Sequence, residues 1–295
     1  MIVRALVLVC LPLLLVACDS DSGSEAATTN PSEGSFVTAP DSGCASMNLL
    51  AADANHTGPG AGVTGLVLDN DCNPLPSFKV LCCTDESCVP TDTMDDGSFY
   101  LGGIMNETPR KVRVVGVTHG FYDALIYMPV VTDELTIASK PIVLAPLNDY
   151  MALSAETGGS ALLAEGQMEL TVAAGSLKYP LGHFTDDLSA QRVDTALVGP
   201  FDTAPYSDVE GAMAFVFDPY DMKVEPTESG DEAVSFAFHA EDHAAAGTVY
   251  DLWSADTHNA HLVAAGTATV GDDGIIRTDA GHTISSLQTI VIIPQ

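Results

Sequence analysis

The sequence predicts an all-β protein in which two β-sandwich domains follow a cleaved signal peptide and a disordered tether. Short segments in which apolar and polar residues alternate recur from residue 61 to the end of the chain. Clusters of Gly, Pro, Asn and Asp separate these segments, and none of them keeps the apolar period of a helix. Because 295 residues exceed the length of about 150 that is usual for one domain, we expect two, over residues 61–147 and 148–295.

The first 17 residues have the pattern of a signal peptide. Arg4 supplies a positive charge, and residues 5–16 form an apolar run that is too short to span a bilayer. The sequence Leu-Val-Ala-Cys that ends at Cys18 resembles the lipobox of bacterial lipoproteins. The resemblance implies that residues 1–17 are removed and that Cys18 carries the acyl chains that anchor the protein to a membrane. The alternative is an ordinary secretory peptide with a chance cysteine. We expect a lipid-anchored protein of the bacterial cell envelope, with the inner or outer membrane left open.

The composition of the remaining chain is strongly acidic. Removal of residues 1–17 leaves 9 basic and 40 acidic residues, which is a formal charge of −31. Such a charge repels nucleic acid, so we expect no nucleic-acid partner. Residues 18–60 are predicted to form the lipidated cysteine and a flexible linker, because residues 19–43 have few large apolar side chains with which to build a core.

Five further cysteines lie close together in the sequence. Export places them in an oxidising space, so we expect disulfides, at most two of them, in the first domain only. Cys82 and Cys83 are adjacent in a predicted strand and point to opposite faces, so only one of them can easily reach Cys88. The connectivity stays open at this point. The candidates are Cys44, Cys72, Cys82, Cys83 and Cys88.

The first predicted domain has the motifs of a known fold. The run VTGLVLDNDCNPLPSFKV, followed by TDTMDDGSFYL and RKVRVVGV, resembles the carboxypeptidase regulatory-like domain, a transthyretin-like sandwich. Cys72 stands where that family usually has a glycine, and Met94 stands in place of its aspartate. These motifs belong to turns and strands, so the resemblance implies a fold and no particular function. The residues that carry it are Gly65, Val67, Asp69, Pro74, Leu75, Thr93, Gly97 and Phe99.

The second predicted domain shows alternation over residues 168–172 and 234–238, and residues 290–293 are wholly apolar, as in a buried closing strand. Residues 158–177 resemble the opening of the β-sandwich shared by zonula occludens proteins, ankyrins and netrin receptors, with Ala173 where a proline is usual. The resemblance implies a second β-sandwich without a catalytic role. Trp253 lies in an apolar strand pattern, which favours core packing over a ligand platform.

Four histidines are the sharpest candidates for metal chemistry. They do not form an HExxH motif, because Glu241 is displaced and a strand rather than a helix precedes it. We interpret them as solvated loop residues. The alternative is a metal-dependent hydrolase in which the histidines bind zinc and Glu241 acts as the base. The four are His239, His243, His258 and His261.

The Asp-Gly pairs at residues 96–97 and 273–274 are typical of hairpin turns, because the glycine takes a positive φ. Their carboxylates keep calcium as an alternative, and zinc and calcium are the only cofactors held open. No nucleophile elbow, phosphate loop or dinucleotide fingerprint is present in the sequence. The sequence therefore predicts a non-enzymatic envelope protein that presents its β-sandwiches to a protein or polysaccharide partner.

Overall fold

The structure is a computed structural model that describes residues 61–295, except 85–86, 105–109, 132–133, 184, 200–208, 228–231, 240–243 and 259. The described residues form strands and three single-turn 3-10 helices, so the predicted all-β class is confirmed. No described helix has the length and apolarity that a membrane span needs. Cys18, Cys44, Glu241 and His243 lie outside the described residues.

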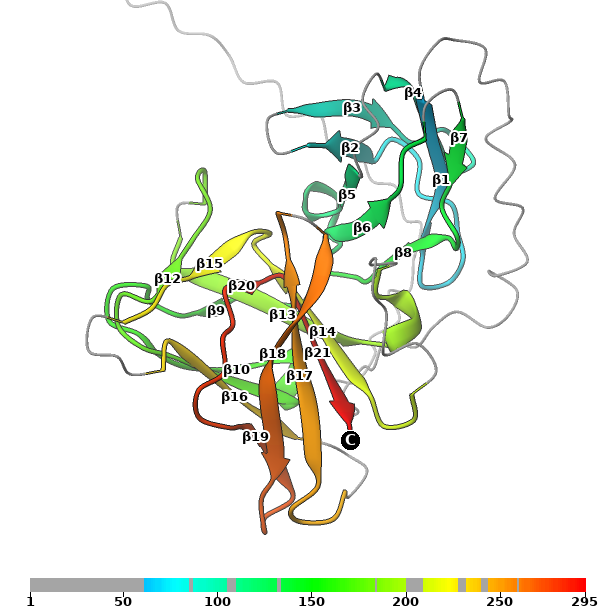
Figure 1. Cartoon of the computed structure of the whole chain (residues 1–295). Helices are drawn as coiled ribbons and strands as arrows, with labels where there is room; N and C mark the ends of the chain where they lie inside the picture. Colours follow the sequence, from blue (N-terminus) through cyan, green and yellow to red (C-terminus); the bar gives the residue numbers. More distant parts are fainter. Residues whose placement is uncertain are drawn as a thin grey trace, which may run out of the picture. The chain divides into compact units, whose positions relative to one another are not determined.

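The N-terminal sheet pair consists of two four-stranded sheets (Figure 1). One has the order β4-β1-β7, with β8 also paired to β1, and the other has the order β3-β2-β5-β6. Their strands are β1 (Ala61–Asp69), β2 (Lys79–Cys83), β3 (Cys88–Asp92), β4 (Ser98–Ile104), β5 (Arg110–Val115), β6 (Ala124–Met128), β7 (Leu135–Ile137) and β8 (Ile142–Leu144), with the 3-10 helix η2 (Val117–His119) after β5.

Several residues of the motif noted in the sequence contact one another inside this sheet pair. A side chain at Gly65 would lie 2.8 Å from the Phe99 ring, so only glycine lets β1 and β4 approach there. The Thr93 hydroxyl accepts a hydrogen bond of 2.9 Å from the Phe78 amide and donates one of 2.5 Å to the Leu75 carbonyl. The motif therefore specifies packing and turn geometry, as the sequence predicted.

The C-terminal sheets are a ten-stranded sheet and a three-stranded sheet (Figure 1). The long sheet has the order β10-β11-β16-β19-β18-β17-β21-β14-β13-β9, and the short one has the order β12-β15-β20. The elements are β9 (Met151–Ala152), β10 (Gly159–Leu163), η3 (Ala164–Gly166), β11 (Met168–Val172), β12 (Leu177–Lys178), β13 (Asp187–Val193), η4 (Thr195–Leu197), β14 (Met213–Asp218), β15 (Met222–Val224), β16 (Val234–His239), β17 (Val249–Asp256), β18 (His261–Val270), β19 (Ile275–Thr278), β20 (Ser286–Leu287) and β21 (Thr289–Pro294).

The ten-stranded sheet wraps around a single core. Ala161 of the edge strand β10 and Leu188 of β13, near the other edge, belong to the same buried cluster as Phe215 and Phe238. Strands from both ends of the order can share a core only if the sheet curls, and β10 indeed contacts β9 and β13. The sequence predicted a β-sandwich for residues 148–295, and the long sheet of that region is nearly closed on itself. The predicted boundary at residue 147 lies between β8 and β9 and stays a prediction.

A third buried cluster joins the two sets of sheets. We call it the shared cluster. Tyr122 and Leu125 of the N-terminal sheet pair pack there with Val291 and Ile293 of β21, and Trp253 lies half-buried against it. The Tyr122 hydroxyl adds a polar contact at the edge of the cluster, where it lies 2.6 Å from the hydroxyl of Ser189. The core packing expected for Trp253 thus occurs in the shared cluster.

The expected disulfide across the TDES turn is present, and Cys83 makes it. Cys83 and Cys88 face each other in the β2–β3 ladder and are joined by a bond of 2.03 Å. Cys82 points to the other face and is buried as a thiol. Cys72 is also disulfide-bonded.

A candidate ligand-binding groove

The three described histidines of the proposed metal site lie at different places along the ten-stranded sheet. His239 ends β16 opposite Ile275 of β19. The neighbouring Ile276 faces Val270, at the far end of β18 from His261. Val270 comes nine positions after His261, which in an extended strand is about 30 Å. His239 therefore lies at the opposite end of the sheet from His261.

His258 comes directly after β17, at the same end as His261, and its backbone amide donates to the Asp256 carboxylate over 2.8 Å. In the described part of the chain, no group of three or more His, Cys, Asp or Glu side chains is placed to hold a metal ion. The strand register thus does not bring His239 together with His258 and His261, as the zinc hydrolase alternative would require.

The two Asp-Gly pairs have the conformation of turns. Gly97 and Gly274 both have a φ of 77°. Asp96 accepts a hydrogen bond of 3.0 Å from the Ser98 amide, and both oxygens of Asp273 accept from Arg277, at 2.9 and 2.8 Å. These hydrogen bonds from Arg277 lower the pKa of Asp273 to about 2. The carboxylates at these turns are therefore engaged in local contacts.

A groove with a volume of ≈ 660 Å³ lies beside the ends of β12, β14 and β15, and we call it the tyrosine groove. This volume is within the range of about 300–1,000 Å³ that is typical of small-ligand sites. The N-terminal sheet pair contributes Arg113 and Val117 to the lining, and the C-terminal sheets contribute the rest. Those residues are Tyr150, Lys178, Tyr179, Pro180, Leu181, Gly182, His183, Asp218, Pro219, Tyr220, Asp221 and Lys223.

Each of the three tyrosines of the groove is fixed by a polar contact. The Tyr150 hydroxyl donates to the buried carboxylate of Asp218. The Tyr179 hydroxyl donates to the Leu153 carbonyl over 2.8 Å. The guanidinium group of Arg113 covers the third ring, that of Tyr220. Because the two hydroxyls are engaged inside the protein, Tyr150 and Tyr179 present mainly ring surface to the groove.

The cations of the groove are held by neighbouring acids. Arg113 donates to Asp123 over 2.7 Å, and its guanidinium carbon lies 3.8 Å from the centre of the Tyr220 ring. Lys223 lies 2.5 Å from Asp221. Because each of these cations is paired with an acid, their hydrogen-bonding groups are held in place and the pairs add no net charge to the groove.

Lys178 is the most loosely held cation of the groove. Its ammonium lies 3.7 Å from the Glu225 carboxylate, which is beyond hydrogen-bond distance, and its side chain is half exposed. A ligand hydroxyl could therefore bind Lys178 without breaking a buried ion pair.

His183 does not form a catalytic relay. Its Nε2 atom lies 3.0 Å from the Asp187 carboxylate and 3.3 Å from the Thr185 hydroxyl, while its ring stacks on Tyr179 with 5.1 Å between centres. A relay needs the carboxylate and the nucleophile on different ring nitrogens, whereas both contacts here use Nε2. The histidine therefore has the geometry of a packing and positioning group.

Burial determines the electrostatics at the back of the groove. Desolvation raises the pKa of Asp218 above its usual value, although the hydrogen bond from Tyr150 opposes the shift. Desolvation also raises the pKa of Tyr150, Tyr179 and Tyr220. The three phenols remain neutral at physiological pH.

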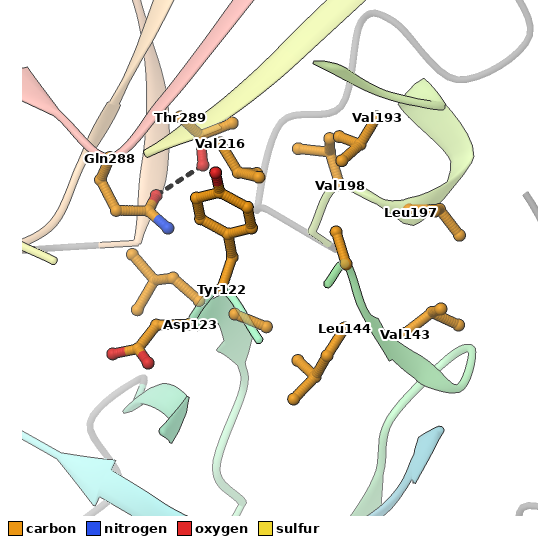
Figure 2. A pocket seen from close by; sticks show the side chains of 13 residues that line it. Tyr122, Asp123, Val143, Leu144, Val193, Leu197, Val198, Val216, Gln288 and Thr289 are labelled. Atoms are coloured by element: carbon orange, nitrogen blue, oxygen red, sulfur yellow. Dashed lines mark hydrogen bonds between the residues drawn. The ribbon is translucent and has the colours of Figure 1, made fainter. Parts of the chain in front are cut away.

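A second cavity, between the two sets of sheets, is much smaller. Figure 2 shows the Tyr122 ring beside Gln288 and Thr289, with Val193 and Val198 across the cavity. Its volume of ≈ 30 Å³ could hold one or two water molecules but not a ligand. This cavity is therefore too small to be the candidate site, whereas the tyrosine groove combines ligand size with three aromatic rings.

Sequence reasoning missed this site, and the reason is physical. Its lining comes from positions between 113 and 223 that no local motif joins. The only local signal is the turn at residues 180–183, where Gly182 has a φ of 94° and the His183 amide donates to the Pro180 carbonyl over 3.1 Å. A turn alone does not indicate a ligand.

Comparisons with known proteins give distant likenesses only. No family model matches the chain, and no curated protein matches it. The family resemblances noted in the sequence therefore stay predictions.

Three solved structures are similar in part. The Bacillus anthracis TIE protein shares 10% identity at a TM-score of 0.27, over 80% of this chain. A candidate carbohydrate-binding protein from Bacteroides uniformis shares 11% identity at a TM-score of 0.23, over 81% of this chain and 100% of its own. BcpA, the major pilin subunit of Bacillus cereus, shares 7% identity at a TM-score of 0.22, over 78% of this chain and 85% of its own. This chain spans 48% of the TIE protein structure. Likenesses at these TM-scores carry no argument about function.

Proposed function

We propose that this chain is a non-enzymatic, lipid-anchored protein of the bacterial cell envelope that binds polysaccharide in the tyrosine groove. The observation that carries the proposal is a groove of ligand size in which tyrosine rings and paired polar groups are already fixed. Such preorganisation reduces the entropy that is lost when a ligand binds.

The chemistry of the lining suits a sugar better than a protein surface. A sugar offers C–H groups that pack on aromatic rings and hydroxyls that both donate and accept hydrogen bonds. The groove supplies both kinds of contact. Its tyrosine rings offer apolar surface, Lys178 and Lys223 can donate hydrogen bonds, and Asp221 can accept them. A stable protein interface would need about 800 Å² on each side, which is more than a groove of this size offers.

The membrane partner is proposed from the sequence pattern at Cys18. Acylation there would tether the β-sheets to the membrane through residues 19–60. Metabolic labelling with palmitate of the full chain and of Cys18→Ser tests this part. Label that persists in the variant would contradict it.

The test of binding uses two lysines that match in ion-pair distance and exposure, although Lys223 also donates to the Thr257 hydroxyl over 2.8 Å. Lys223 lies 2.5 Å from Asp221, with its side chain 47% exposed, and Lys79 lies 2.5 Å from Asp92, with its side chain 48% exposed. Of these two lysines, Lys223 lines the groove and Lys79 does not. The chain from Asp19 onward, exported so that its disulfides form, would be run through gels that contain β-glucan, mannan, dextran or alginate.

We expect at least one polysaccharide to retard the wild-type chain. Lys223→Ala should bind that polysaccharide about tenfold more weakly, which corresponds to the loss of one charged hydrogen bond of about 1.5 kcal/mol. Lys79→Ala should bind like the wild type. Absence of retardation by all four polysaccharides, or equal loss in the two variants, would refute the proposal.

A further inference from the structure

Tyr150 is the most open aromatic ring of the tyrosine groove. Its residue is 37% exposed, whereas Tyr179 and Tyr220 are half-buried. The His183 ring stacks on Tyr179, and the Arg113 guanidinium covers one face of Tyr220. Among the described residues, no ring or guanidinium group is stacked on Tyr150 in this way. It is therefore the ring whose surface is most available to a ligand.

The Tyr150 ring is anchored to strands of the ten-stranded sheet. Its hydroxyl donates to Asp218, which is 3% exposed and ends β14. Asp218 faces Ser189 in the β13–β14 ladder, and β9, directly after Tyr150, pairs with β13 as well. Both ends of the hydrogen bond thus rest on β13, so the ring is fixed before a ligand arrives.

We propose that Tyr150 is the stacking platform for one sugar ring, and that the groove takes polysaccharides built of pyranose rings whose hydroxyls are all equatorial. This inference rests on the proposed polysaccharide binding and names the ligand class for the same groove. Leu181, which also lines the groove and is fully exposed at a turn, supplies a second apolar surface.

The choice of ligand class follows from the shape of the ring face. In a pyranose with equatorial hydroxyls, C–H groups occupy the faces of the ring, and they can pack flat against an aromatic surface. An axial hydroxyl projects from one face of the ring. That face cannot pack flat against an aromatic surface without burying the hydroxyl, which would then lack a hydrogen-bond partner, so the sugar keeps one stacking face instead of two.

The experiment compares two oligosaccharides and four forms of the protein. Titration calorimetry would measure the binding of cellohexaose, in which every ring hydroxyl is equatorial, and of mannohexaose, in which the 2-hydroxyl is axial. The variants are Tyr150→Leu, which keeps apolar volume without a ring, Tyr150→Phe, which keeps the ring without the bond to Asp218, and Tyr100→Leu as the control. Tyr100 is a half-buried tyrosine of β4 and does not line the groove.

We expect the wild type to prefer cellohexaose by at least fivefold. Tyr150→Leu should bind it about tenfold more weakly, Tyr150→Phe two- to fivefold more weakly, and Tyr100→Leu equally well. A melting curve for each variant checks that it is folded, and Tyr150→Phe, the smaller change, provides the test if Tyr150→Leu does not fold.

The outcomes separate this inference from the function on which it rests. If Lys223→Ala weakens polysaccharide binding while both Tyr150 variants bind like the wild type, the groove binds sugar and Tyr150 is not its platform. A preference for mannohexaose would overturn the ligand class. If no polysaccharide binds, the proposed function fails as well.

Discussion

The glycines of the two Asp-Gly turns have the same backbone conformation in different surroundings. Gly97 and Gly274 both have a φ of 77° and both follow an aspartate. A side chain at Gly97 would meet the Val67 carbonyl oxygen at 2.5 Å, whereas one at Gly274 would meet nothing within 4 Å. The Gly97 position thus combines a conformational requirement with a close approach of two backbone segments.

Substitution of the two glycines separates these effects. Gly274→Ala should lower the free energy of unfolding by about 1 kcal/mol, which is the cost of a left-handed conformation for alanine. Gly97→Ala should cost at least about 3 kcal/mol, because β1 and the turn must also move apart. Urea denaturation of both variants measures the difference. Equal losses would show that the contact with Val67 relaxes freely.

At the scale of single elements, the disulfide closes the β2–β3 hairpin. Cys83 and Cys88 are directly opposite in the ladder and are separated by five positions in sequence. The edge strand β3 is mostly exposed, so few apolar contacts hold it to the sheet. The cross-link therefore supplies much of what keeps β3 in place.

Removal of this disulfide should free the edge strand. Cys83→Ser with Cys88→Ser should lower the free energy of unfolding by about 2 kcal/mol, as expected for a short closed loop. Hydrogen exchange should accelerate in β3 and remain slow in β5, on the other side of β2. Cys82→Ser is the control for loss of a thiol. It should lower the free energy of unfolding by disturbing the buried core, and not by freeing β3. Unchanged exchange in β3 would show that the ladder alone holds it.

The sequence predicts where individual strands lie better than it predicts which strands pair with one another. Alternation over residues 168–172 and 234–238 marks β11 and β16, because a period of two depends only on which face is buried. It does not specify that β16 pairs with β19 rather than with β17, its successor in the chain. That order depends on contacts between distant residues. The curl of the ten-stranded sheet was therefore not predictable from the pattern.

The tyrosine groove was unpredictable for the same reason. Tyr150 and Asp218 are 68 positions apart and are brought together only by the ladders of β13 with β9 and β14. The histidine cluster shows the converse, because residues close in sequence, such as His239 and His261, are separated by the length of β18. Proximity in sequence was thus a poor guide to proximity in the folded chain.

At the scale of the whole molecule, the shared cluster couples the two sets of sheets. Tyr122 and Leu125 are buried there against residues of β17, β18 and β21. Two lysines add polar contacts, since Lys111 donates to the Thr257 carbonyl over 3.2 Å and Lys140 donates to the Val198 carbonyl over 3.1 Å. An interface of this kind, apolar at its centre and polar at its rim, predicts that residues 61–295 unfold together.

A charge placed in the shared cluster should break this coupling. We expect the wild-type chain to show one calorimetric transition, with the calorimetric and van't Hoff enthalpies equal. Leu125→Asp should give two transitions, because an unpaired carboxylate in the shared cluster separates the sheets while each set keeps its own core. Leu101→Ala, a change in the core of the N-terminal sheet pair, should lower the free energy of unfolding by about 2–4 kcal/mol and leave a single transition. Two transitions in the wild type would show that the shared cluster does not couple the sheets. The tyrosine groove, which takes Arg113 from one set and Tyr150 from the other, would then change shape whenever the sheets separate.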